Sequence, residues 1–111
     1  IPHSIKVFEI CGPMFFAVTE QILKITANHH TKVIVLRMRS VPAIDASAMK
    51  CLLDLVERAR KKNITIIFSH VNDQPMHMME KGDFVDIVGQ ENFRDNIVEA
   101  LDYAEELVNE K

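Results

Sequence analysis

The sequence predicts a small single α/β domain, built on a four-stranded, mostly parallel sheet with about four helices. Its length of 111 residues is close to the commonest domain size. Continuous apolar runs at residues 32–36 and 64–69 are typical of strands that are buried on both faces of a parallel sheet. Segments with apolar residues at helical spacing alternate with these runs, as they do when helices pack on such a sheet.

In the first half of the chain, residues 5–10 alternate apolar and charged side chains and predict a strand with one covered face. Gly12 and Pro13 end this strand. Apolar residues recur at helical spacing over residues 15–29, so a helix is expected there before the strand at 32–36. A second amphipathic helix follows Asp45, runs to about residue 60 and is closed by Asn63.

In the second half, residues 64–69 predict a third strand. A short helix is expected from Asp73 or Gln74 to Lys81, with Pro75 near its first turn and Gly82 at its C′ position. The run at residues 85–88 predicts a short fourth strand or extended segment. The apolar stripe of residues 93–109 predicts a final helix that begins at Phe93. The expected order is therefore β-α-β-α-β-α-β-α.

The loop at residues 41–49 joins a buried strand directly to a helix and is the main candidate site. Asp45 stands where an N-cap belongs, since its carboxylate can accept from the free N–H groups of the first turn. Ser47 then falls within that turn, where the helix dipole favours negative charge. One hypothesis is simple capping beside a small serine. The other is a phosphate attached at Ser47, or an anion docked there.

The carboxyl ends of parallel strands are where ligands and switches gather. Gly12–Pro13 and the loop at residues 41–49 both lie at such ends, so they are expected to be neighbours in space. Arg37 and Arg39 are either solvated edge charges or receivers of an anion or nucleotide phosphate near Ser47. A nucleotide site has little support, because there is no phosphate-binding glycine loop and there are three glycines in all.

Composition excludes several function classes. A net charge of −3 argues against a nucleic-acid partner. No apolar run is long enough to span a membrane, and no secretory signal is present. The two cysteines are expected to be reduced thiols, and the five histidines show no zinc spacing, so neither a metal nor a cofactor is expected. No catalytic triad or acid–base pair is evident, which predicts a protein that is not an enzyme.

Two short segments invite a second interpretation. Residues 76–79 contain three methionines, which predict a helix that tucks some of them into the core. An adaptable partner surface and a soft-metal site are the alternatives. Phe15 and Phe16 are expected to be core and loop anchors, or partner contacts where a ring is exposed.

Two motifs together resemble the STAS domain (sulfate transporter and anti-sigma factor antagonist). Residues 35–49 resemble that family's strand, its V-P-x-I-D loop at Val41, Pro42, Ile44 and Asp45, and its small-residue turn into a helix. Residues 12–17 resemble the G-P-L-F-F-A turn of the branch attached to SulP-type anion permeases. The resemblance covers nearly the whole chain, so residues 1–111 are interpreted as one STAS domain.

The resemblance implies a non-catalytic regulatory domain on the cytoplasmic side of the inner membrane, tethered to a SulP-type sulfate or anion transporter. Its partners would be the membrane domain of the same chain or a cytosolic regulatory protein. A chain that begins at Ile1 rather than Met is expected to be an excised fragment, with a membrane segment before it. The alternatives are a stand-alone anti-sigma factor antagonist switched at Ser47 and a sensor that binds a nucleotide or anion weakly.

In anti-sigma factor antagonists the residue two after the Asp is a phosphorylated serine, which corresponds here to Ser47. The family often has glycine at the next position, whereas this chain has Ala48, whose methyl group narrows access to the hydroxyl. The residues expected to form the helix N-cap and its loop are Asp45, Ala46, Ala48 and Met49. Those expected to contact a partner or anion are Gly12, Pro13, Phe15, Phe16, Arg37, Arg39, Val41 and Pro42.

Overall fold

A sheet of parallel strands forms the centre of the protein, as expected. The computed structural model describes residues 4–10, 15–25 and 30–109. Within them four strands pair in the order β1-β2-β3-β4 and every pair is parallel. The strands are β1 (Ile5–Glu9), β2 (Val33–Arg37), β3 (Thr65–Ser69) and β4 (Phe93–Arg94).

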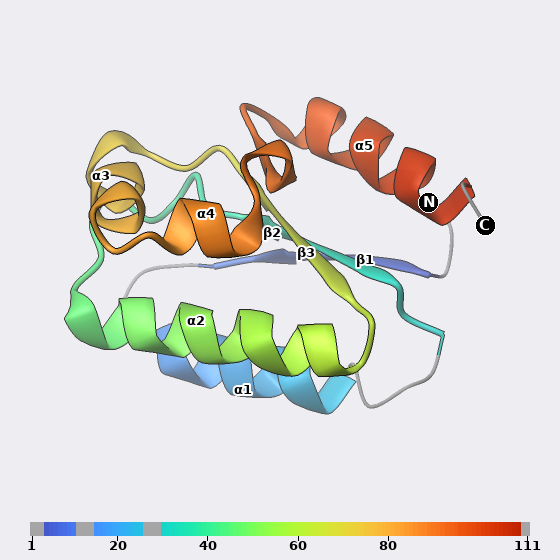
Figure 1. Ribbon diagram of the computed structural model, residues 1–111, viewed down its shortest axis with the longest axis horizontal. Helices are drawn as coiled ribbons and strands as arrows, with labels where there is room; N and C mark the ends of the chain where they lie inside the picture. The colour runs from blue at the N-terminus through green and yellow to red at the C-terminus, as the bar shows by residue number, and fades with distance from the viewer. Residues whose placement is uncertain (1–3, 11–14, 26–29, 110–111) are drawn as a thin grey trace.

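Helices cover both faces of this sheet, which gives three layers (Figure 1). Helices α1 (Phe15–Ile25) and α2 (Ala46–Lys61) lie on one face, and α5 (Ile97–Asn109) lies on the other. Helix α3 (Asp73–Lys81) lies beyond the carboxyl ends of the strands. The short α4 (Phe84–Val88) shares the core cluster to which α2 contributes. This arrangement leaves the loop from β2 to α2 at the same end of the molecule as α3.

Strand β2 explains why its sequence is continuously apolar. Ile34 and Leu36 are fully buried against α1 and α2, whereas Val33 and Val35 are buried against α5. Since successive side chains of a strand point to opposite faces, a strand covered on both sides needs apolar residues at every position. The prediction of a doubly covered strand is confirmed.

The expected fourth strand at residues 85–88 is wrong, because this segment forms helix α4. Its single turn buries Phe84 and Val88, which are four residues apart and therefore share one helical face. Asp83 precedes the helix in a left-handed conformation (φ 61°), and Gly89 follows it with a positive φ of 102°. Because neither backbone conformation is helical, the helix is confined to that turn. The fourth strand is instead the two-residue β4.

The last helix begins at Ile97 and not at Phe93 as expected. Asn96 caps it, since its side chain accepts from the Glu99 N–H (2.9 Å) and donates to the Glu99 carboxylate (2.8 Å). Phe93 belongs to β4, where its ring stacks on Phe68 with centroids 5.2 Å apart. The aromatic contact thus assigns Phe93 to the sheet.

Two helix ends test the expected capping residues. Helix α2 ends at Lys61, and Asn63 follows with φ 61°, which agrees with its expected closing position. The prediction that Gly82 occupies the C′ position of α3 is wrong. Gly82 is the C-cap residue, with φ −97°, and the next residue, Asp83, adopts the left-handed conformation. The expected extension of the first helix to residues 26–29 lies outside the described residues.

Candidate functional site

The loop between β2 and α2 is held by buried side chains and presents exposed ones between them. Met38, Val41 and Ile44 are buried in the core, whereas Pro42 and Ala43 are exposed. The Val41 N–H donates to the Met38 carbonyl at 2.9 Å, which closes a turn directly after the strand. The loop is therefore a fixed surface feature rather than an extended linker.

Asp45 ends this loop and caps α2. Its backbone is extended (φ −108°), and its carboxylate accepts from the Ala48 N–H at 2.9 Å. A carboxylate here satisfies one of the free N–H groups of the first turn and interacts favourably with the helix dipole. Strand, loop and helix thus follow one another as the sequence predicts.

Ser47 is the second residue of α2 and is exposed to solvent. It stands three positions before Lys50, so both side chains share one side of the helix. Ala46 is exposed as well, whereas Ala48 and Met49 are half-buried and pack against the core. The hydroxyl is accessible, and the first helical turn around it favours a negative charge.

Two amide side chains near the start of α3 hold the loop from across the sheet edge. The Asn72 side-chain amide donates to the carbonyls of Val41 (2.9 Å) and Arg39 (3.2 Å). Gln74 accepts from the Ile44 N–H (2.8 Å) and donates to the Ile44 carbonyl (3.2 Å). Sequence reasoning missed both residues, because each acts on backbone groups about thirty positions away and neither belongs to a motif.

Arg37 and Arg39 converge on a carboxylate of β1. Arg39 Nε lies 3.3 Å from Glu9 Oε2, and Arg37 lies 3.9 Å from Glu9 Oε1. Ser40 Oγ donates to the same Glu9 carboxylate at 2.9 Å. The hydrogen bonds from Arg39 and Ser40 lower the pKa of Glu9. Both guanidinium groups are therefore directed to Glu9, and this pairing does not favour a phosphate site next to Ser47.

The other expected contact segment lies outside the described residues in part. Gly12 and Pro13 fall between described segments, and of Phe15 and Phe16 the structure describes the helical backbone alone. The end of β1 nevertheless lies beside the end of β2, since the Ile10 N–H donates to the Arg37 carbonyl at 3.1 Å. The expected contact between Gly12–Pro13 and the loop remains a prediction.

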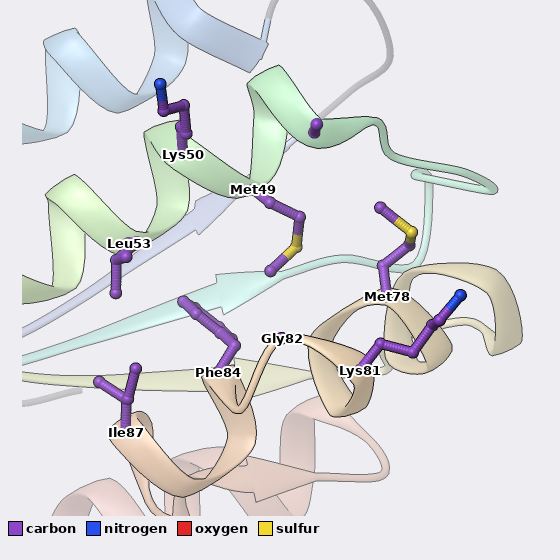
Figure 2. A pocket seen from close by; sticks show the side chains of 9 residues that line it. Met49, Lys50, Leu53, Met78, Lys81, Gly82, Phe84 and Ile87 are labelled. Carbon is purple, nitrogen blue, oxygen red and sulfur yellow. The ribbon is translucent and has the colours of Figure 1, made fainter.

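An apolar groove opens next to the loop, between α2 on one side and α3 with α4 on the other (Figure 2). Its volume is about 380 Å³. Met78 is at its edge, while the neighbouring Met79 is fully buried in the core. The methionine-rich segment therefore serves both the core and this surface. The lining residues are Ala46, Met49, Lys50, Leu53, Met78, Lys81, Gly82, Phe84 and Ile87.

Metal-binding groups, membrane-spanning helices and free thiols each bear on function in the part of the chain that the structure describes. In residues 4–10, 15–25 and 30–109, no three His, Cys, Asp or Glu side chains are grouped to hold a metal ion. Over the same ranges, no helix is both long and apolar enough to cross a bilayer. Cys51 is a half-buried free thiol.

The described residues thus form a parallel α/β domain with a capped strand-to-helix loop at one end. The sequence profile described as the STAS domain matches residues 1–100, so the chain belongs to the STAS domain family. No curated protein sequence matches this chain at a significant level.

Solved structures agree with this assignment. A sulfate transporter family protein from Wolinella succinogenes is 34% identical, with a TM-score of 0.86 over 98% of this chain and 91% of that one. The SulP transporter STAS domain from Vibrio cholerae is 23% identical, with a TM-score of 0.91 over 100% of this chain and 88% of that one. The second likeness supports the fold, and the first also supports the family.

Proposed function

We propose that this chain is the cytoplasmic, non-catalytic regulatory domain of a SulP-type sulfate or anion transporter. It would act through protein contacts made at the loop between β2 and α2. The family assignment and the relative from Wolinella succinogenes support the transporter context. The observation that carries the proposal is the loop itself: Pro42 and Ser47 are exposed on a backbone held by Asn72, Gln74 and the Asp45 cap.

A rigid, exposed loop is suited to recognition because binding costs little ordering entropy. The partner in this proposal is the membrane domain of the same transporter, to which the domain would be tethered. The domain would alter transport by binding one state of that membrane part better than another, as any conformational regulator must.

Photo-crosslinking of the complete gene product in its own cells tests the partner. A photoreactive amino acid replaces Pro42, and a matched control replaces Glu105 on the exposed side of α5. Cross-linked peptides from the membrane-spanning part of an anion transporter at residue 42, absent at residue 105, would support the proposal. Equal cross-linking at both positions would contradict it.

Exposure of Ser47 in the first turn of α2 favours one further candidate, a free-standing antagonist switched by phosphorylation. A phosphate there adds nearly two negative charges beside Asp45. If residue 42 cross-links to a protein kinase instead of a membrane domain, and mass spectrometry finds phosphate on Ser47, this candidate replaces the transporter proposal.

A further inference from the structure

We infer that the groove between α2, α3 and α4 is a docking site for an amphipathic helix of another protein whose apolar face is bordered by carboxylates. The inference assigns a second binding surface to the proposed regulatory domain, and it rests on the proposed function because it takes the domain to act through protein contacts. The groove adjoins the loop, since Ala46 lines it and Ser47 is the next residue.

The floor of the groove is suited to apolar side chains of a helix. Phe84 points toward α2, with Leu53 and Ile87 on one side of its ring and Met49 on the other (Figure 2). Ile87 is 37% exposed, although it is a large apolar residue. Met49 and Met78 face each other across the opening (Figure 2), and methionine side chains adapt to irregular apolar surfaces. A groove walled by helices is a common receptor for an amphipathic helix.

The borders of the groove define the charge of the partner. Lys50 on α2 and Lys81 on α3 are among its lining residues, and no acidic residue is. In Figure 2 the Lys50 side chain extends outward from α2, and Lys81 lies at the α3 end of the groove. Within the described ranges, neither lysine forms an ion pair with another side chain. These two unpaired cations favour a helix with Asp or Glu beside its apolar stripe and disfavour one with Lys or Arg.

A second copy of this chain is a poor occupant. Two other large hydrophobic residues are notably exposed in the described ranges, Val7 on β1 and Val98 on α5. They belong to different elements, so neither forms an apolar helix face that could fill the groove. The occupant is therefore assigned to another protein.

The position of Ser47 connects this groove to regulation. A phosphate on Ser47 would lie one turn before Lys50 on the same side of α2, where it can pair with that ammonium group. Pairing would remove one of the two border cations and add negative charge near the groove. Phosphorylation is thus expected to weaken binding of the acidic helix.

The test is a titration of the ¹⁵N-labelled protein with two synthetic helical peptides, followed by NMR. Both present leucines at i, i+3, i+4 and i+7, and one has glutamates where the other has lysines beside them. We expect the glutamate peptide to shift the amides of Met49, Leu53, Met78 and Ile87. We expect the lysine peptide to bind about tenfold more weakly, because two border charges then repel it.

Charge reversal supplies the matched control. The double variant Lys50→Glu with Lys81→Glu should lose the glutamate peptide and gain the lysine peptide. The double variant Lys61→Glu with Lys62→Glu makes the same change in net charge on exposed residues at the far end of α2, and should bind both peptides like the parent chain.

The inference would be overturned by equal affinity for both peptides, by shifts outside the groove, or by equal effects of the two double variants. Groove shifts that depend on protein concentration alone would assign the site to a second copy, and would overturn it as well. Cross-linking at residue 42 does not depend on these outcomes, so failure of the groove and failure of the proposed function remain distinguishable.

Discussion

Gln74 and Ile44 form two hydrogen bonds, in which the Gln74 side chain on α3 pairs with both backbone polar groups of Ile44 in the loop. The Gln74 carboxamide accepts from the Ile44 N–H at 2.8 Å and donates to the Ile44 carbonyl at 3.2 Å. Ile44 itself is 7% exposed, so its backbone groups have little access to water. The pair therefore fixes the segment that leads into Asp45 and Ser47.

Removal of this amide should loosen the loop. We expect Gln74→Ala to lower the free energy of unfolding by about 1–3 kcal/mol, because two partly buried backbone groups lose their partner. Urea unfolding measures this change, and hydrogen exchange of the Ile44 amide should become markedly faster. Gln90→Ala, at an exposed glutamine, is the control. Equal stability of the two variants, with a protected Ile44 amide, would contradict the structural role.

The Asp45 cap makes a separate, local contribution. Asp45→Ala should lower the free energy of unfolding by about 1 kcal/mol, since the Ala48 N–H loses its acceptor. Asp45→Ser should recover most of that loss, because a serine hydroxyl can accept the same bond. Thermal unfolding of the three proteins provides the measurement. A serine variant as unstable as the alanine variant would show that the carboxylate acts in another way.

How far the sequence determines this structure depends on how local each signal is. The buried strands, the Asp45 cap and the helices α1 and α2 follow from patterns within a few residues, and these predictions are confirmed by the fold. In contrast, four residues at 85–88 cannot distinguish a strand from one helical turn, because both periods fit so short a run. Burial of Phe84 and Val88 on one core face decides for the helix.

The start of α5 could have been predicted better. Asn96 and Glu99 form an N-x-x-E capping pattern, which is readable in the sequence and places the helix start after Asn96. The roles of Asn72 and Gln74 could not, since they depend on the fold bringing α3 to the loop. For the same reason the groove and its two lysines have no signature in the sequence.

Phe93 offers a test of the corrected strand assignment. Its ring stacks on Phe68 at 5.2 Å and meets Phe84 edge-on at 6.5 Å. We expect Phe93→Ala to lower the free energy of unfolding by about 2–3 kcal/mol, because a partly buried aromatic contact is lost and a cavity remains. Val98→Ala, at a valine that is 64% exposed, should change it by less than about 0.5 kcal/mol. Similar urea midpoints for the two variants would contradict this packing.

The contacts of Glu9 predict how stability depends on pH. Hydrogen bonds from Arg39 and Ser40 lower the pKa of Glu9 from its ordinary value of 4.5 in the folded protein. The folded state therefore binds fewer protons here than the unfolded state, so the stabilisation is complete above that value and is lost as the pH falls through the lowered folded pKa. The Glu9→Gln variant should be less stable than the parent at neutral pH, and the difference should disappear in acid.

Urea unfolding of both proteins from neutral pH to about pH 3 measures this difference. Added salt should reduce it at neutral pH, because the ion pairs of Glu9 with Arg37 and Arg39 are partly exposed to solvent and are therefore screened. Glu106→Gln is the matched control, since Glu106 is exposed and forms no ion pair within the described residues. A Glu9→Gln profile parallel to that of the parent at every pH would show that the cluster at the ends of β1 and β2 does not stabilise the fold.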